Sequence, residues 1–250
     1  MRKQSPCNLG DPSPQTGDES LALPMIPREL LATAEIPGGD EMRLYRRGDD
    51  HMILLERTEL MSTRMSGSEE ALATLTAQRM GVRPGQRWLI GGYGMGFTLR
   101  KALEVLPADA EVTVAELVPE IMDWARGPMA ELTAGGLTDK RTRIHLGDVA
   151  EPIRQGGGKD AGFDAILLDV DNGPDALVRA ANQWLYEPGG LAITKAALKP
   201  GGVLAIWSAA ADSRFSKTLL QAGFRVEEQE VRGRSNGKGP HHFIWFASLR

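Results

Sequence analysis

The stretch Trp88–Gly96, WLIGGYGMG, decides the fold of this chain. An apolar run ends here in a pair of glycines, and three glycines in a G-x-G-x-G spacing then lead into a helical pattern at 98–106. Glycine allows the positive φ of a tight turn and lets a ligand approach the backbone, and a helix N-terminus presents unpaired N–H groups. We therefore predict a nucleotide cradle, with a plain tight turn as the alternative. The residues predicted to contact the ligand are Gly91, Gly92, Tyr93, Gly94 and Gly96.

The next strand-like run, 111–117, carries an acidic residue at its end. Glu116 can accept hydrogen bonds from both hydroxyls of a ribose at this place, and Leu117 is expected beside it. The alternative is that Glu116 caps a helix that begins near Pro119.

Strands and helices alternate from Arg87 onward, which is typical of a parallel sheet covered by helices on both faces. The last two strands are joined by a glycine-rich turn without a helix, and this predicts an antiparallel hairpin. We expect an α/β fold with a doubly wound, Rossmann-like, seven-stranded and mostly parallel sheet. The predicted strands are 87–91, 111–117, 142–147, 163–170, 202–208, 224–231 and 242–248, and the predicted helices are 98–106, 119–126, 177–186, 189–198 and 213–222.

Three regions differ in composition. Residues 1–24 are rich in Ser, Pro, Gly and Asp and predict a disordered leader. Residues 25–66 contain three short strand patterns separated by turn residues, which predict a small antiparallel β unit. A helix at 69–80 then opens the nucleotide-binding domain, 67–250.

The overall composition narrows the possible partners. A net charge of −4 argues against broad attraction to nucleic acid, and no apolar run is long enough to span a membrane. A single cysteine, Cys7, and four histidines predict no metal site and fit a cytoplasmic protein.

Two further strand ends carry acidic groups, where ligands collect in open α/β sheets. The third predicted end has Gly147, Asp148 and Val149, and the fourth has Asp169 and Asp171. No P-loop lysine follows the glycines, and phosphates fit poorly among so many carboxylates, so a positively charged sulfonium nucleoside fits better. The alternatives are that Asp148 caps the following helix and that Asp171 belongs only to a turn.

On these residues the chain resembles the spermidine synthase family, the polyamine aminopropyltransferases, within the class I adenosylmethionine-dependent transferase fold. The similarity runs from about Arg43 to the C-terminus and includes the segment LKPGGVL at 198–204. The resemblance implies that Glu116 binds ribose and Asp148 contacts adenine. It also implies that Asp169 lies beside the transferred group and helps to deprotonate the attacking amine. It further implies a homodimer.

The chain departs from the family pattern at several positions. An aspartate of the family's glycine loop, which holds the amine of the aminopropyl group, aligns with Met95. The family's gate of tyrosine, histidine and glutamate aligns with Ser68, Glu69 and Glu70, and Glu59 falls where a glutamine is common.

These departures lead to an expectation about the transferred group. Arg64 and nearby hydroxyls could bind the carboxylate of intact adenosylmethionine, or they could form a solvated linker with Ser66 or Ser68 capping the next helix. We therefore expect methyl transfer from adenosylmethionine to a small amine, with Asp169 as base and Asp171 orienting the amine. The alternatives are aminopropyl transfer from decarboxylated adenosylmethionine and a non-catalytic nucleoside-binding protein.

Overall fold

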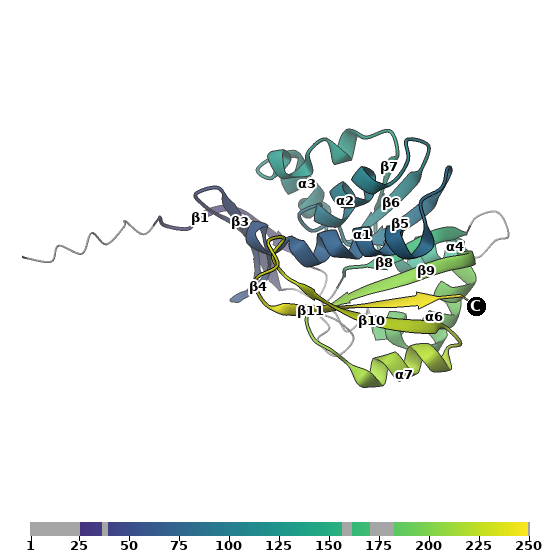
Figure 1. The fold of residues 1–250 in the computed structure, drawn as a ribbon. Coiled ribbons are helices and arrows are strands. Elements are labelled where there is room, and N and C mark those ends of the chain that lie inside the picture. Colours follow the sequence, from purple (N-terminus) through teal and green to yellow (C-terminus); the bar gives the residue numbers. More distant parts are fainter. Residues whose placement is uncertain (1–25, 37–39, 157–161, 171–182, 250) are drawn as a thin grey trace, which may run out of the picture.

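The computed structural model describes residues 26–36, 40–156, 162–170 and 183–249 (Figure 1). The predictions for the leader, for Cys7, for Asp171 and for the first part of the helix at 177–186 lie outside these ranges. The described chain forms a four-stranded sheet followed by a seven-stranded sheet, which is the predicted α/β architecture.

The N-terminal sheet is an antiparallel meander of β1 (Glu29–Glu35), β2 (Glu41–Arg47), β3 (Asp50–Leu55) and β4 (Thr58–Ser62). The sequence predicted only the first three strands. The turn into β4 has no glycine to mark it, and Glu56 adopts the positive φ of 52° instead. The fourth strand is defined by its pairing with β3.

The large sheet has the order β10-β11-β9-β8-β5-β6-β7, with β11 antiparallel to both of its neighbours. The chain moves outward from β5 in one direction and from β8 in the other, so the topological switch point lies between these two strands, where ligands bind in such folds. The strands are β5 (Arg87–Gly91), β6 (Glu111–Glu116), β7 (Thr142–Leu146), β8 (Phe163–Leu168), β9 (Leu198–Ser208), β10 (Arg225–Arg232) and β11 (His241–Ser248).

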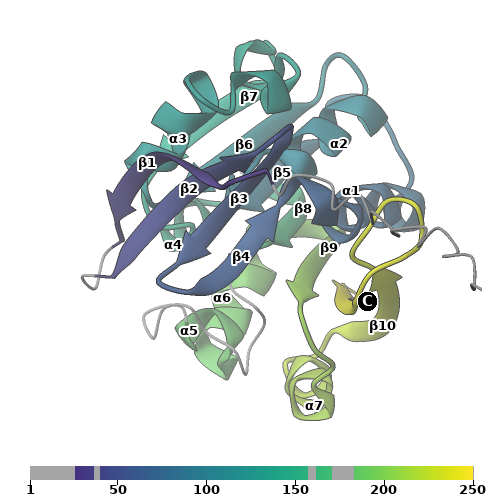
Figure 2. The ribbon, with the colours of Figure 1, turned by 90° about the vertical axis from the view of Figure 1, so that its left-hand side faces the viewer.

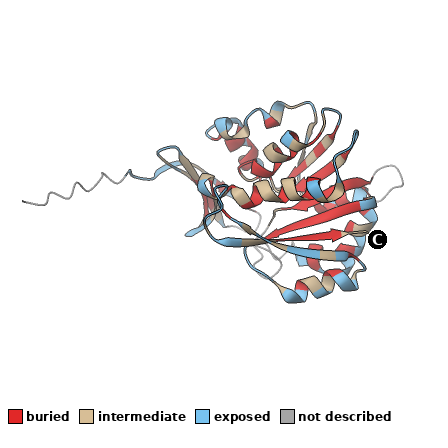
Figure 3. Ribbon diagram, in the orientation of Figure 1, coloured by how far each residue is buried: buried red, intermediate tan, exposed pale blue. Residues whose placement is uncertain are grey.

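Helices cover both faces of this sheet, and the central strands between them are buried (Figure 3). Trp88 and Ile90 point into the core formed with α1, α2 and α3, and Leu89 points into the opposite core with α4 to α7. This alternation follows from the two-residue period of a strand. The helices are α1 (Gly67–Met80), α2 (Phe97–Val105), α3 (Pro119–Arg126), α4 (Ala150–Gln155), α5 (Gln183–Tyr186), α6 (Pro188–Ala197) and α7 (Ser213–Gln221), with short 3-10 turns at Thr63–Met65, Ala130–Thr133 and Gly136–Thr138.

The N-terminal sheet lies in front of the large domain when the molecule is turned by 90° (Figure 2). The 3-10 turn and α1 connect the two sheets. Within the described ranges, no helix is long and apolar enough to cross a membrane.

Candidate nucleoside and acceptor site

A cavity of about 400 Å³ opens at the carboxyl ends of β5, β6, β7 and β8. Its walls come from distant parts of the chain, because apolar residues of the N-terminal sheet lie opposite the strand ends of the large sheet. The polar lining residues are Glu59, Glu69, Glu116, Asp148, Asp169 and His242. The apolar lining includes Ile36, Met42, Ile53, Met61, Met65, Leu117, Val118, Ile121, Val149 and Trp207.

The glycine loop between β5 and α2 forms one edge of the cavity. Gly92 and Gly94 line it, with φ of 86° and 54°. A Cβ on Gly92 would lie 2.4 Å from the carbonyl oxygen of Asp169, so only glycine fits this close approach. Gly96, with φ of 78°, is the N-cap of α2. Tyr93 is buried beside it, and its hydroxyl has no hydrogen-bond partner among the described residues. Of the five predicted loop contacts, the structure therefore places only two on the cavity surface.

Glu116 is buried at the end of β6 and holds the glycine loop in place. Its Oε2 accepts a hydrogen bond from the backbone N–H of Tyr93 at 2.8 Å, and its Oε1 accepts one from Val118 at 2.8 Å. Burial raises the pKa of this carboxyl, and the backbone N–H groups oppose that shift. The residue thus braces the approach to α3 and also lines the cavity. Its position beside the glycine loop suits the ribose of a nucleoside.

The end of β7 brings the predicted Gly147, Asp148 and Val149 to the cavity. Asp148 Oδ1 accepts a hydrogen bond from the backbone N–H of Ala150 at 2.8 Å. This bond engages the first backbone N–H of α4, whose N-cap is Val149 rather than Asp148, and it fixes the carboxylate at the cavity wall.

Glu69 and Asp169 form an acidic pair at the cavity. The Thr98 hydroxyl lies 3.2 Å from Asp169 Oδ2 and 3.3 Å from the carbonyl oxygen of Glu69, so it links α1 with the end of β8. Burial raises the pKa of Asp169 to about 6. Burial, together with the charge of Asp169, raises the pKa of Glu69 to about 8. Two carboxylates in one desolvated place resist joint ionisation, and a bound cation would relieve that cost.

The predicted gate residues divide between the cavity and other contacts. Glu59 and Glu69 line the cavity. Arg64 is exposed and its Nε donates to Asp50 Oδ2 at 2.6 Å, so the structure does not bring its guanidinium to the cavity. Glu70 pairs with Arg100 at 3.3 Å instead.

The start of α1 also differs from the expectation. The helix begins at Gly67, and no serine side chain caps it. Ser68 is fully buried and donates to Glu69 Oε2 at 3.0 Å. Because Ser68 lies inside the helix, its hydroxyl serves the site rather than the helix terminus.

Met95 does not face the cavity. It is only 1% exposed and packs in the core shared by α1, α2 and α3. The chain turns at Gly94 and Gly96, and these turns direct the side chain between them inward. The residue that aligns with the family's aspartate therefore does not line the cavity. This corrects the expectation that Met95 determines which form of adenosylmethionine binds.

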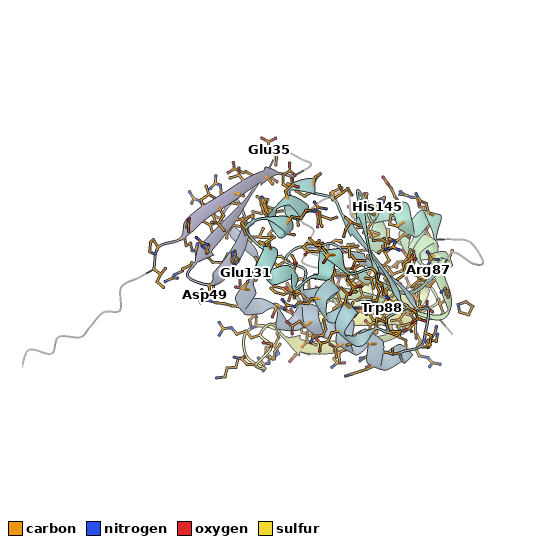
Figure 4. The ribbon with its side chains drawn as sticks, turned by 90° about the horizontal axis from the view of Figure 1, so that it is seen from above. Glu35, Asp49, Arg87, Trp88, Glu131 and His145 are labelled. Atoms are coloured by element: carbon orange, nitrogen blue, oxygen red, sulfur yellow. The ribbon has the colours of Figure 1, made fainter. Side chains whose placement is uncertain are left out.

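Trp207 of β9 and His242 of β11 are lining residues that the sequence did not identify. Adjacent residues of a strand face opposite sides, so one member of the His241–His242 pair had to point inward. By contrast, His145 on β7, labelled in Figure 4, has its Nε2 3.1 Å from Glu151 Oε2. It is not among the lining residues. Across the described ranges, no group of three or more His, Cys, Asp or Glu side chains has the arrangement of a metal site.

Comparisons with known proteins agree with this geometry. No family model matches the chain. A polyamine aminopropyltransferase of Mycobacterium tuberculosis is 28% identical over 198 residues, which cover 76% of this chain and 36% of the relative. Polyamine aminopropyltransferase 1 of Hyperthermus butylicus is 29% identical over 134 residues, which cover 52% of this chain and 44% of the relative. The chain thus spans about a third of the length of the mycobacterial relative.

Solved structures of spermidine synthases share the fold. The enzyme from Thermotoga maritima superposes with a TM-score of 0.69 at 18% identity, over 88% of this chain and 73% of the other. A spermidine synthase in complex with the transition state analogue AdoDATO has a TM-score of 0.67 at 17% identity, over 88% of this chain and 72% of the other.

The sheet order and the strand-end cavity define a protein of the class I methyltransferase-like fold. Within that class, the chain is similar in sequence to polyamine aminopropyltransferases and similar in fold to spermidine synthases.

Proposed function

We propose that this chain transfers an aminopropyl group from decarboxylated adenosylmethionine to a small amine. The observation that carries the proposal is the charge of the cavity. No lysine or arginine is among its described lining residues. The cavity is lined by five carboxylate residues, which are Glu59, Glu69, Glu116, Asp148 and Asp169.

This charge favours the decarboxylated co-substrate over intact adenosylmethionine. The intact compound carries a carboxylate, and a carboxylate about 4 Å from one of these side chains would be repelled by on the order of 4 kcal/mol at an effective dielectric constant of about 20. Arg64, the expected partner of that carboxylate, is already paired with Asp50. The decarboxylated compound presents a sulfonium and an ammonium, and both are attracted to the cavity. The names of the relatives support aminopropyl rather than methyl transfer as well.

Three of the acidic residues have separate roles in this proposal. Glu116 accepts hydrogen bonds from the ribose hydroxyls, and Asp148 accepts one from the adenine amino group. Asp169 lies between the glycine loop and Glu69, where the reacting carbon and the attacking amine meet.

The reaction is an in-line displacement. The amine nitrogen forms a bond to the carbon next to sulfur as the carbon–sulfur bond breaks, and the sulfur keeps the electron pair of that bond and leaves as a neutral thioether. The attacking ammonium must first lose a proton, and Asp169 accepts it. The raised pKa of Asp169 suits this role, because a stronger base takes the proton more readily at neutral pH. The protein otherwise contributes by holding the two reactants in line.

The test compares three ligands by calorimetry: decarboxylated adenosylmethionine, intact adenosylmethionine and methylthioadenosine. We expect the decarboxylated compound to bind at least about tenfold more tightly than the intact one, a difference of ~1.4 kcal/mol. Putrescine should then be consumed with release of methylthioadenosine. Tighter binding of the intact compound would restore methyl transfer, and binding of all three ligands without turnover of any amine would indicate a non-catalytic nucleoside-binding protein.

A further inference from the structure

The loop between β10 and β11 is anchored to the start of α1 (Figure 1). The backbone N–H of Gly67 donates to the carbonyl oxygen of Gly233 at 2.9 Å. A Cβ on Gly67 would lie 2.4 Å from the carbonyl carbon of Arg234, so the two segments touch through their backbones. This anchor brings the first residues of β11 next to the acidic pair.

A hydrogen-bonded chain of three side chains crosses this junction. His242 Nδ1 lies 2.8 Å from Ser68 Oγ, and Ser68 Oγ lies 3.0 Å from Glu69 Oε2. Ser68 is fully buried, whereas His242 and Glu69 both reach the cavity surface. The imidazole also packs edge-on against Trp207, with 4.9 Å between ring centroids and an interplanar angle of 75°. The ring is therefore held both at its Nδ1 and by its contact with Trp207.

The single proton of the Ser68 hydroxyl determines which groups donate and which accept in these two hydrogen bonds. When Glu69 is ionised, it can only accept, so Ser68 donates to Glu69 and must itself accept from His242 Nδ1–H. In a neutral imidazole, Nε2 then carries a lone pair. Burial lowers the pKa of His242, which keeps the ring neutral. No residue of the described chain makes a hydrogen bond with Nε2.

We propose that His242 binds the acceptor amine through Nε2, which accepts a hydrogen bond from the amine, and that Ser68 sets the tautomer this requires. The inference rests on the proposed function, because it needs an amine in the cavity. A cationic amine favours the ionised form of Glu69. Ionised Glu69 accepts from Ser68, Ser68 accepts from His242 Nδ1–H, and His242 Nε2 is then free to accept a hydrogen bond from the amine. His242 thereby adds an acceptor without adding another negative charge. The titratable groups that line the cavity together with His242 include Glu69 on α1, Asp169 after β8 and Glu59 on β4.

The binding test uses the full chain saturated with methylthioadenosine and titrated with putrescine. We expect His242→Phe, which keeps a ring against Trp207, to weaken putrescine binding by about 2- to 13-fold, the range of one typical hydrogen bond. Affinity for methylthioadenosine should not change. The matched control is His241→Phe on the same strand, because His241 pairs with exposed Glu230 and does not line the cavity. Equal putrescine affinity in wild type and His242→Phe would overturn the inference.

The tautomer test uses nitrogen NMR, and its decisive measurement is made on the wild type. With methylthioadenosine and putrescine bound, His242 should show a protonated Nδ1 and an unprotonated Nε2, and Ser68→Ala should lose this preference. A protonated Nε2 in the loaded wild type would overturn the inference. If the wild type binds methylthioadenosine but no amine, the proposed function itself fails and the inference fails with it. If the wild type binds putrescine and only the His242 results are negative, the proposed function stands alone.

Discussion

Glu116 Oε2 accepts a hydrogen bond from the backbone N–H of Tyr93 at 2.8 Å, so the acidic residue at the end of β6 holds the glycine loop at the end of β5. The same carboxylate accepts from Val118 before α3. The residue proposed to bind ribose therefore also determines the shape of the loop around it, and changes at this position affect binding and folding together.

We predict that Glu116→Ala weakens methylthioadenosine binding by ~1.5–3 kcal/mol, the range for hydrogen bonds to a charged group. The variant should also unfold at lower urea concentration, because two buried N–H groups lose their acceptor. Calorimetry and urea titration measure the two effects. Glu111→Gln, at the opposite end of β6 and away from the cavity, is the control. Unchanged affinity in a folded Glu116→Ala variant would contradict the ribose assignment.

The close approach of Gly92 to Asp169 predicts a large steric effect. Gly92→Ala must displace the Asp169 backbone, whereas Gly81→Ala meets no atom within 4 Å, although both glycines have positive φ. Gly81→Ala should lower the free energy of unfolding by about 1 kcal/mol, the lower end of the range for a non-glycine residue at positive φ. Gly92→Ala should cost more and also weaken nucleoside binding. Urea unfolding compares the two variants. An equal decrease in the free energy of unfolding would mean that the contact with Asp169 does not contribute to stability.

Glu69 predicts a pH dependence of stability. Its folded pKa is raised above the unfolded value, so its contribution to stability is complete below the unfolded pKa and is lost as pH rises through the folded pKa. The ligand-free protein should therefore lose stability between about pH 5 and about pH 8. Glu69→Gln should reduce this slope. Urea unfolding at several pH values measures it, and a slope identical in the two proteins would refute the assignment.

Asp169 predicts a loss of turnover without a loss of nucleoside binding. Asp169→Asn should lower the rate of putrescine consumption by about 10²–10⁴-fold, the typical contribution of a general base. Methylthioadenosine affinity should remain within a few-fold, because Glu116 and Asp148 hold the nucleoside. Exposed Asp123→Asn on α3 is the control. Turnover within a few-fold of wild type would remove Asp169 from the proposed mechanism.

Assembly is a separate prediction. We propose a homodimer, because β1 is the edge strand of a small sheet and such edges are usually covered. Leu30 on this strand is 50% exposed. Light scattering at micromolar concentration should give twice the chain mass, and deletion of residues 1–24 should not change that result. A monomeric mass would count against the dimer.

The alternation of strands and helices in the large domain could be predicted from local patterns. An apolar strand, a glycine turn and a helix in succession specify a βα unit, and the acidic residue at the next strand end specifies which edge of the sheet binds the ligand. Both signals depend on neighbours in the sequence, and Glu116 and Asp148 accordingly lie at the predicted cavity. The strand β4 lacked such a signal, because its turn contains Glu56 at positive φ instead of glycine.

Only the tertiary structure decided which side chains share the cavity. Met95 lies in the glycine loop yet points into the core, because the glycines on either side turn the chain. Arg64 lies near the gate yet pairs with Asp50. His242, distant in sequence, reaches Ser68 because the β10–β11 hairpin packs on α1. Sequence spacing specifies the direction of a side chain within one element, whereas the distance between elements depends on how their backbones pack.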